Sequence, residues 1–245
     1  MIRIVTDYLN DTANRYPDKI AFSDLNREIS FKEVKAEAHR IASEFIDKNL
    51  FKDPVVIYLD KSVEVLVSFM GVAYSGNFYT PIDTSMPENR IEKIIETLKP
   101  KAIITDQAHE QVALKIANGA EVLLYSDLMK KEIPDENKIK RVTDKILDTD
   151  ILYVLFTSGS TGIPKGVIIC QKSVVDYAEW VTNTFEISNE TVFGEQAPFY
   201  FDNSILDIYQ TIKNGATLHI IPQQYFKLPK KLFELLNEKK VNTIF

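Results

Sequence analysis

The sequence predicts an α/β protein with two doubly wound, mostly parallel sheets that carry helices on both faces. Three observations favour this fold class. Short runs rich in Val, Ile and Leu alternate with amphipathic helical segments along almost the whole chain, which is typical of parallel sheet covered by helices. A length of 245 residues is enough for one large domain or two small ones. Hydrophobic residues make up 45% and charged residues 26%, as in ordinary globular proteins.

The first half of the chain shows the helical periodicity most clearly. Residues 6–16 are expected to form a helix that Pro17 ends. Ser30 and Glu33 form a capping box, in which a hydroxyl and a carboxylate satisfy backbone N–H groups at the start of a helix. The helix that follows places these apolar residues on one face: Val34, Ala38, Ile41, Ala42 and Phe45. We expect 85–88 to repeat the capping box before a helix with this buried stripe: Ile91, Ile94, Ile95 and Leu98.

The remaining elements follow the same alternation. Strands are expected at 20–23, 55–59, 78–82, 102–105, 122–125, 152–156, 167–169, 191–194, 216–221 and 241–245. Further helices are expected at 62–74, 110–117, 173–184, 204–212 and 228–239. The segment 130–150 is rich in Lys, Asp and Glu and contains Pro134, so it is predicted to be a boundary loop. We therefore expect an N-terminal α/β lobe, 1–146, and a lobe that binds ATP and substrate, 147–245.

Several classes of function and location are disfavoured by composition. A formal net charge of −6 argues against a nucleic-acid partner, because such a partner needs a basic face. No apolar segment is long enough for membrane insertion. Because Cys170 is the one cysteine of the sequence, an internal disulfide is excluded. This favours a reducing compartment, so a cytoplasmic protein is expected. Phe245 closes an apolar strand with no polar tail, and we expect the chain to be the front part of a longer protein.

The three histidines and the aromatic residues of the helix 173–184 are expected to have structural roles. His39 and His109 are expected on solvated helices and His219 in the core, and none has metal-ligand spacing to another. Tyr177, Trp180 and Val181 on one helix are expected to lie in the core: their spacing suits a buried face.

The strongest motif begins where the predicted strand 152–156 ends. Residues 157–166 read Thr-Ser-Gly-Ser-Thr-Gly-Ile-Pro-Lys-Gly. Glycines let backbone N–H groups approach an anion, hydroxyls donate to phosphate or turn a lone pair to Mg²⁺, and a lysine adds a mobile positive charge. A polar surface turn is the structural alternative, but strands are predicted on both sides of this segment. A Walker-type loop is excluded, because Pro164 stands at the sixth position from Gly159.

This segment resembles the signature loop of the adenylate-forming superfamily, which includes acyl-CoA synthetases, luciferases and the adenylation domains of peptide synthetases. Segments 29–34, 76–91 and 201–218 resemble further blocks of the superfamily, in order along the chain. The resemblance implies ATP and Mg²⁺ as cofactors. It assigns the β- and γ-phosphates to Thr157, Ser158, Gly159, Ser160, Thr161, Gly162, Lys165 and Gly166. It also makes Thr161 the candidate magnesium ligand.

The resemblance implies which parts of the enzyme are present. The adenine loop, the acid that holds the ribose and the catalytic lysine of the superfamily would lie beyond Phe245. No catalytic residue is therefore expected within the chain, and the 245 residues alone are expected to be inactive.

The Phe201-Asp202-Asn203-Ser204 element resembles the branch that activates amino acids. In that branch its aspartate binds the α-ammonium group of the substrate, and Asp202 matches this position. Asn203 and Leu206 match positions that shape the side-chain pocket. A helix cap is the structural alternative for Asp202.

The segment 196–209 is most similar to stand-alone ligases that charge a carrier protein with D-alanine. This implies an amino-acid substrate and, as partner, a carrier protein with a phosphopantetheine arm. An acyl- or aryl-CoA synthetase is the alternative within enzymes, although no histidine stands near Phe199 and Tyr200. A non-catalytic docking or scaffold module is the alternative of another class.

Overall fold

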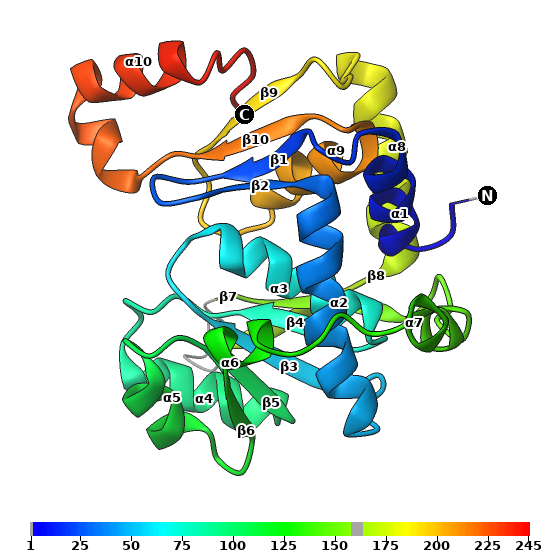
Figure 1. The fold of residues 1–245 in the computed structure, drawn as a ribbon. Coiled ribbons are helices and arrows are strands. Elements are labelled where there is room, and N and C mark those ends of the chain that lie inside the picture. Colours follow the sequence, from blue (N-terminus) through cyan, green and yellow to red (C-terminus); the bar gives the residue numbers. More distant parts are fainter. Residues whose placement is uncertain (1, 158–163) are drawn as a thin grey trace. The chain divides into compact units, whose positions relative to one another are not determined.

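The computed structural model describes residues 2–157 and 164–245 and confirms an α/β fold with two separate mixed sheets (Figure 1). The chain divides into two compact units made of discontinuous segments. The first unit comprises Met1–Lys35, Lys61–Val63 and Ser173–Phe245, and the second comprises Ala36–Asp60 and Glu64–Lys172. The predicted lobes 1–146 and 147–245 divide the chain differently and stay a prediction.

The first unit has a four-stranded sheet in the order β2-β1-β10-β9. Its strands are β1 (Ile20–Ser23), β2 (Glu28–Ser30), β9 (Val192–Glu195) and β10 (Thr217–Ile220). β1 pairs in parallel with β10, where Phe22 lies opposite Leu218, and both side chains are fully buried. The discontinuity of this unit follows from that pairing, because an early strand completes its sheet only with a late one. Its helical elements are α1 (Val5–Arg15), most of α8 (Gln171–Phe185), α9 (Ser204–Asn214), the 3₁₀ turn η1 (Gln223–Lys227) and α10 (Pro229–Glu238).

The second unit has a six-stranded sheet in the order β6-β5-β3-β4-β7-β8. Its strands are β3 (Pro54–Tyr58), β4 (Phe78–Pro81), β5 (Ala102–Thr105), β6 (Glu121–Leu124), β7 (Ile151–Thr157) and β8 (Lys165–Cys170). All neighbouring pairs are parallel except β7 and β8. Its helices are α3 (Val63–Tyr74), α4 (Glu88–Leu98), α5 (Glu110–Ile116), α6 (Tyr125–Met129) and α7 (Glu136–Thr143), and α2 (Phe31–Asp47) begins in the first unit.

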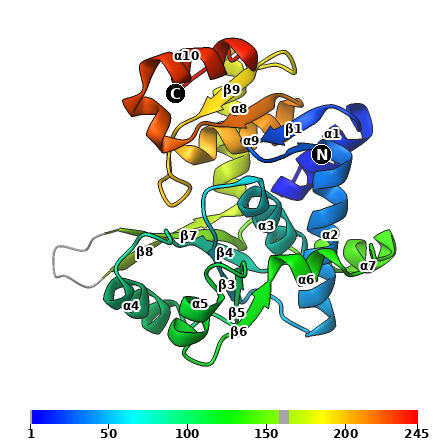
Figure 2. The same ribbon diagram turned by 60° about the vertical axis from the view of Figure 1, so that its left-hand side comes forward.

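Helices cover both faces of this second sheet, as expected. Figure 2 shows α3 on the opposite side of the strands from α4 and α5. Val56 and Tyr58 of β3 contribute to a buried cluster that includes the stripe of α4 and Ala113 and Ile116 of α5. No helix among the described residues is both long and apolar enough to cross a membrane.

Capping was predicted correctly at one helix and wrongly at another. At the start of α2, Ser30 N donates to Glu33 Oε2 at 2.8 Å and Glu33 N donates to Ser30 Oγ at 3.4 Å. α4 instead begins at Glu88 with Pro87 as its N-cap and no side-chain cap. Ser85 donates from both its N and its Oγ to Asp83 Oδ1, at 2.9 and 2.8 Å. The second capping box is therefore absent, because Asp83 forms a tight turn with Ser85 before the helix starts.

Several further elements differ from expectation, among them β2, α6 and η1, which were not predicted. The segment 130–150 contains α7, whose first turn is capped by Asp135 Oδ1 accepting from Asn137 N at 3.1 Å. Ile139 supplies the buried side chain of this helix, which the high charge of the segment had obscured. The predicted strand 241–245 forms only an isolated parallel bridge between Phe193 and Thr243.

Candidate functional site

The β7–β8 hairpin holds the two ends of the predicted phosphate loop. The strands are antiparallel, and Thr157 lies opposite Lys165 in the last pair of the ladder. Thr157 Oγ1 donates to the Lys165 carbonyl at 3.5 Å, and both side chains are exposed. The structure therefore brings Thr157, Lys165 and Gly166 together at one end of the hairpin. The other predicted phosphate and magnesium ligands lie outside the described residues: Ser158, Gly159, Ser160, Thr161 and Gly162.

The position of the hairpin end within the sheet suits a ligand site. β3, β4 and β5 are parallel and in register, so that Ile57 lies opposite Pro81 and Tyr58 lies opposite Thr105. β7 runs parallel to β4, with Tyr153 opposite Tyr79. Thr157 therefore leaves the sheet at the edge where the carboxyl ends of the parallel strands meet. Open α/β sheets bind ligands at this edge. An exposed hydroxyl and ammonium group there are chemically suited to phosphate.

Gly166 has a packing reason to be glycine. A Cβ atom at this position would lie 2.7 Å from Val154 Cγ1 and 3.3 Å from Phe156 Cζ. The neighbouring side chains of β7 therefore occupy the space that any larger residue would need. A role for Gly166 in phosphate binding stays a prediction.

A second group of polar residues at the same edge of the sheet was not predicted. Thr84 Oγ1 donates to Asp60, His109 Nδ1 lies 2.8 Å from Asp106 Oδ1, and His109 Nε2 lies 3.5 Å from Asp60 Oδ1. His109 is the N-cap residue of α5, and its ring meets Tyr58 edge-on. The solvated helical surface expected for His109 is therefore wrong. A polar residue just after each strand was the signal that could have found the group.

The other two histidines lie inside the protein. His39 is 4% exposed and meets the Tyr74 ring edge-on, so its predicted solvated position is also wrong. His219 is buried in β10, as expected, but its Nδ1 atom has no hydrogen-bond partner among the described residues. Burial, and then Lys239, lower the pKa of His219 to about 4.

The Asp202 element lies on the loop between β9 and α9 in the first unit. Asp202 and Asn203 are exposed, and Leu206 is half-buried in the first turn of α9. Asn203, not Asp202, is the N-cap residue, and it makes no side-chain cap bond. The helix-cap alternative for Asp202 is therefore wrong. No hydrogen bond or ion pair ties the Asp202 carboxylate to another described residue, so this charge is available to a ligand.

α8 contributes an exposed aromatic surface near this loop. Tyr177 is 38% exposed and Trp180 is 56% exposed, which contradicts the expected core positions, whereas Val181 is buried as expected. The helix turns a wider polar and aromatic face to solvent than the apolar spacing suggested. Burial, then the carboxylates of Asp202 and Asp207, raise the pKa of the Tyr177 hydroxyl, so these groups share one neighbourhood.

A buried ionic cluster was missed by the sequence analysis. Glu195, the last residue of β9, is fully buried, and Asp207 of α9 is 3% exposed. Lys61 Nζ donates to the Glu195 carbonyl at 3.0 Å and lies 3.6 Å from Glu195 Oε1. The ammonium group also lies 5.1 Å from the centre of the Phe199 ring. The available signals were a glutamate that ends an apolar strand and an aspartate within the apolar stripe of a helix.

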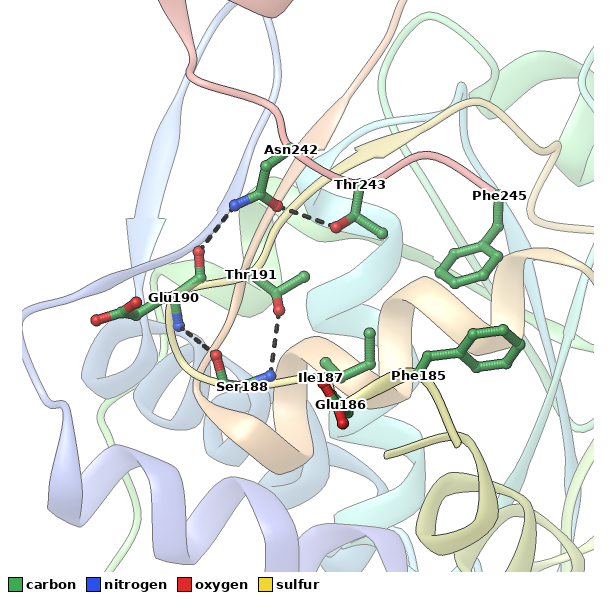
Figure 3. A pocket seen from close by; sticks show the side chains of 9 residues that line it. All are labelled: Phe185, Glu186, Ile187, Ser188, Glu190, Thr191, Asn242, Thr243 and Phe245. Atoms are coloured by element: carbon green, nitrogen blue, oxygen red, sulfur yellow. Dashed lines mark hydrogen bonds between the residues drawn. The ribbon is translucent and has the colours of Figure 1, made fainter. Parts of the chain in front are cut away.

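A separate pocket in the first unit contains none of the predicted ligands (Figure 3). Its side chains line a shallow space between the end of α8 and the last residues of the chain: Phe185, Glu186, Ile187, Ser188, Glu190, Thr191, Asn242, Thr243 and Phe245. Asn242 Nδ2 donates to the Glu190 carbonyl at 3.1 Å, and Ser188 N donates to Thr191 Oγ1 at 3.1 Å. These two hydrogen bonds pair the Thr191 hydroxyl and the Asn242 amide within the pocket itself. Within residues 2–157 and 164–245, no group of three His, Cys, Asp or Glu side chains is placed so that it could hold a metal ion.

Curated relatives of similar sequence are described as D-alanine–D-alanyl carrier protein ligases. The chain is 32% identical over 238 residues to a D-alanine–D-alanyl carrier protein ligase of Staphylococcus epidermidis, covering 96% of this chain and 46% of the relative. A ligase of the same description from Listeria monocytogenes is 33% identical over 228 residues, covering 89% and 43%. The chain thus spans less than half the length of these curated relatives.

Solved structures support the fold. The nonribosomal peptide synthetase FmoA3, bound to α-methyl-L-serine-AMP, matches with a TM-score of 0.86 at 21% identity, over 98% of this chain and 26% of that one. VinN in complex with 3-methylaspartate matches with a TM-score of 0.83 at 17% identity, over 100% and 67%. The family model described as AMP-binding enzyme matches residues 9–245. Because this model matches nearly the whole of the chain, the chain belongs to the AMP-binding enzymes.

Proposed function

We propose that the protein activates a small amino acid, D-alanine in the first place, as its aminoacyl-AMP. The reaction would consume ATP, release pyrophosphate and then transfer the aminoacyl group to the phosphopantetheine thiol of a carrier protein. The observation that carries the proposal is the exposed carboxylate of Asp202 in the loop before α9, which has no hydrogen-bond or ion-pair partner among the described residues. The similarity to D-alanine–D-alanyl carrier protein ligases over 96% of the chain supports this choice of substrate.

In this proposal Asp202 binds the α-ammonium group of the amino acid. A charge-assisted hydrogen bond in a site closed by substrate is stronger than the same bond in water. Asn203 and Leu206 shape the space for the side chain, and the half-buried position of Leu206 suits a small substrate. The amine is thus held while the carboxylate at the other end of the amino acid reacts.

The hairpin end is proposed to hold the triphosphate of ATP. Thr157 and the loop residues that follow would donate hydroxyl and N–H groups to the β- and γ-phosphates, and Lys165 would neutralise charge. Mg²⁺, when bound to ATP, would neutralise phosphate charge further, with Thr161 as its proposed protein ligand. The substrate carboxylate attacks the α-phosphorus in line and pyrophosphate leaves with its electron pair. Positioning and charge stabilisation account for most of the rate in such transfers.

We propose a cytoplasmic location. ATP is available there, and the Cys170 thiol, which forms no disulfide bond among the described residues, would stay reduced.

Pyrophosphate exchange in the intact protein tests the proposal. Labelled pyrophosphate should enter ATP when D-alanine is added and much more slowly with larger amino acids. Exchange with a fatty or aryl acid, but with no amino acid, would show an acyl- or aryl-CoA synthetase instead. Absence of saturable MgATP binding by calorimetry would show a non-catalytic module.

A further inference from the structure

The buried ionic cluster of the first unit contains more acid than base. Glu195 is 0% exposed, Asp207 is 3% exposed, and the Lys61 side chain is 25% exposed to solvent. With all three groups ionised the cluster would carry one uncompensated negative charge away from water. Such a charge is costly in a protein interior. The cluster therefore needs a proton or a further cation, and no other cation is paired with these carboxylates among the described residues.

The oxygens of the two carboxyl groups show the same deficit. Both Glu195 carboxylate oxygens and Asp207 Oδ1 are buried and have no donor within hydrogen-bonding geometry among the described residues, although the Lys61 ammonium group and the Ala197 amide lie near Glu195. Two ionised carboxylates cannot hydrogen-bond to each other, whereas a protonated carboxyl group donates to an ionised one. Burial raises the pKa of both groups, and the adjacent Glu195 carboxylate raises that of Asp207 further. One shared proton thus supplies both the missing donor and the missing charge.

The cluster joins both ends of the loop that carries Asp202. Glu195 is the last residue of β9, the loop comprises 196–203, and Asp207 lies in the first turn of α9. Lys61 reaches the cluster from a segment that is distant in sequence, and the Val63 amide of that segment donates to Asp24 Oδ2 at 3.0 Å. Lys61 also contacts the buried ring of Phe199 within the loop.

We propose that Lys61, Glu195 and Asp207 form a buried positioning triad, in which the two carboxyl groups share one proton and which holds the 196–203 loop so that Asp202 meets the substrate amine. The assignment of Asp202 rests on the proposed function, whereas the shared proton and the anchoring of the loop do not. The three residues are positioning residues, because none of them is placed against the substrate.

A charge-balance series of variants in the intact protein tests the triad. Glu195→Gln and Asp207→Asn each leave one carboxylate opposite Lys61, so each should change the KM for D-alanine by less than about threefold. The double variant leaves Lys61 without a partner in a buried site and should raise that KM roughly tenfold or more, with the KM for ATP unchanged. Adding Lys61→Met to the double variant should restore much of the loss, because the cluster is then neutral again. Glu179→Gln, which alters another ion pair of the same unit, serves as the matched control and should have no effect.

Two measurements are independent of catalysis. Infrared difference spectra should show the carbonyl band of one protonated carboxylic acid in the wild type, and either single amide variant should lose it. Amide hydrogen exchange of residues 196–203 should accelerate in the double variant and slow again in the triple variant.

The outcomes separate the two proposals. Effects of the two single variants that simply multiply in the double variant, together with no protonated-acid band, would overturn the triad. If no amino acid supports pyrophosphate exchange but the band and the exchange pattern are as expected, the triad stands and the proposed function fails. If the double variant does not fold, the band and its loss in the single variants still decide the matter.

Discussion

The two loops assigned to substrates differ in how the fold supports them. The phosphate loop leaves a hairpin whose strands are neighbours in sequence, and its last pair, Thr157 and Lys165, is set by the local ladder. The 196–203 loop is anchored instead by Lys61, far away in sequence, through contacts with Glu195 and Phe199. A local hairpin can be recognised from a motif. An anchor that depends on distant residues can be recognised only once the chain is folded.

The largest expected effect would come from the phosphate side of this comparison. Lys165→Met removes the one described ammonium group at the hairpin end, and the kcat/KM for ATP in pyrophosphate exchange should fall roughly 10²–10³-fold. The fall should be the same for every amino acid, because phosphate contacts are common to all substrates. Lys101 is an exposed lysine just before β5, and Lys101→Met should be neutral. A loss confined to one amino acid would place Lys165 on the amino-acid side instead.

The acid stability of the first unit should depend on His219. Its folded pKa is lowered to about 4 from an ordinary value of 6.5, so between these values the unfolded chain binds a proton that the folded chain does not. The contribution of neutral His219 to the free energy of unfolding is fully present above pH 6.5. It decreases as the pH falls towards 4, by about 3 kcal/mol in all. In His219→Gln the urea midpoint of unfolding should change less with pH across this window than in the wild type. If the urea midpoint had the same slope against pH in the variant and in the wild type, His219 would take up its proton in the folded protein without unfolding it.

The hairpin should be intolerant of a methyl group at Gly166. Gly166→Ala forces a contact with Val154, which should cost about 1–3 kcal/mol in urea unfolding. Val154→Ala creates the missing space, so the double variant should be less destabilised than the sum of the single variants. Strict additivity would show that the close packing of this position is not what excludes a side chain.

The smallest effects contrast two serines with the same sequence pattern. Ser30→Ala removes a capping hydroxyl and should cost about 1 kcal/mol, whereas Ser85→Ala should stay within about 0.5 kcal/mol. Both can be measured by urea unfolding. Equal costs would mean that the turn at Asp83 stabilises α4 as strongly as a capping box would.

The sequence was sufficient for features that depend on near neighbours. The apolar stripe of α2 and the capping pair of Ser30 and Glu33 follow from helical geometry alone, and the structure confirms both. Features that depend on distant partners were missed. The pairing of β1 with β10 gives discontinuous units. Whether 241–245 forms a strand depends on how it pairs with β9, and it forms an isolated bridge rather than a strand.

The candidate site shows the same division. The hairpin and the Asp202 element were found as motifs, but the helix-cap alternative for Asp202 could be rejected only from the position of Asn203 at the N-cap. Charge in a buried place was hardest to foresee. Asp207 resembles an ordinary helical carboxylate in the sequence, and only its burial beside Glu195 gives it a role.

Substrate discrimination by Asp202 tests the proposed function most directly. Pyrophosphate exchange should be measured with D-alanine and with propionate, which lacks the amine, in the intact wild type and in Asp202→Asn. The wild type should prefer D-alanine strongly. Asp202→Asn should lose most of that preference, by roughly 10²-fold or more, because the charged partner of the ammonium group is gone. An unchanged preference for D-alanine in Asp202→Asn would contradict the assignment of Asp202 and, with it, this account of how the substrate is held.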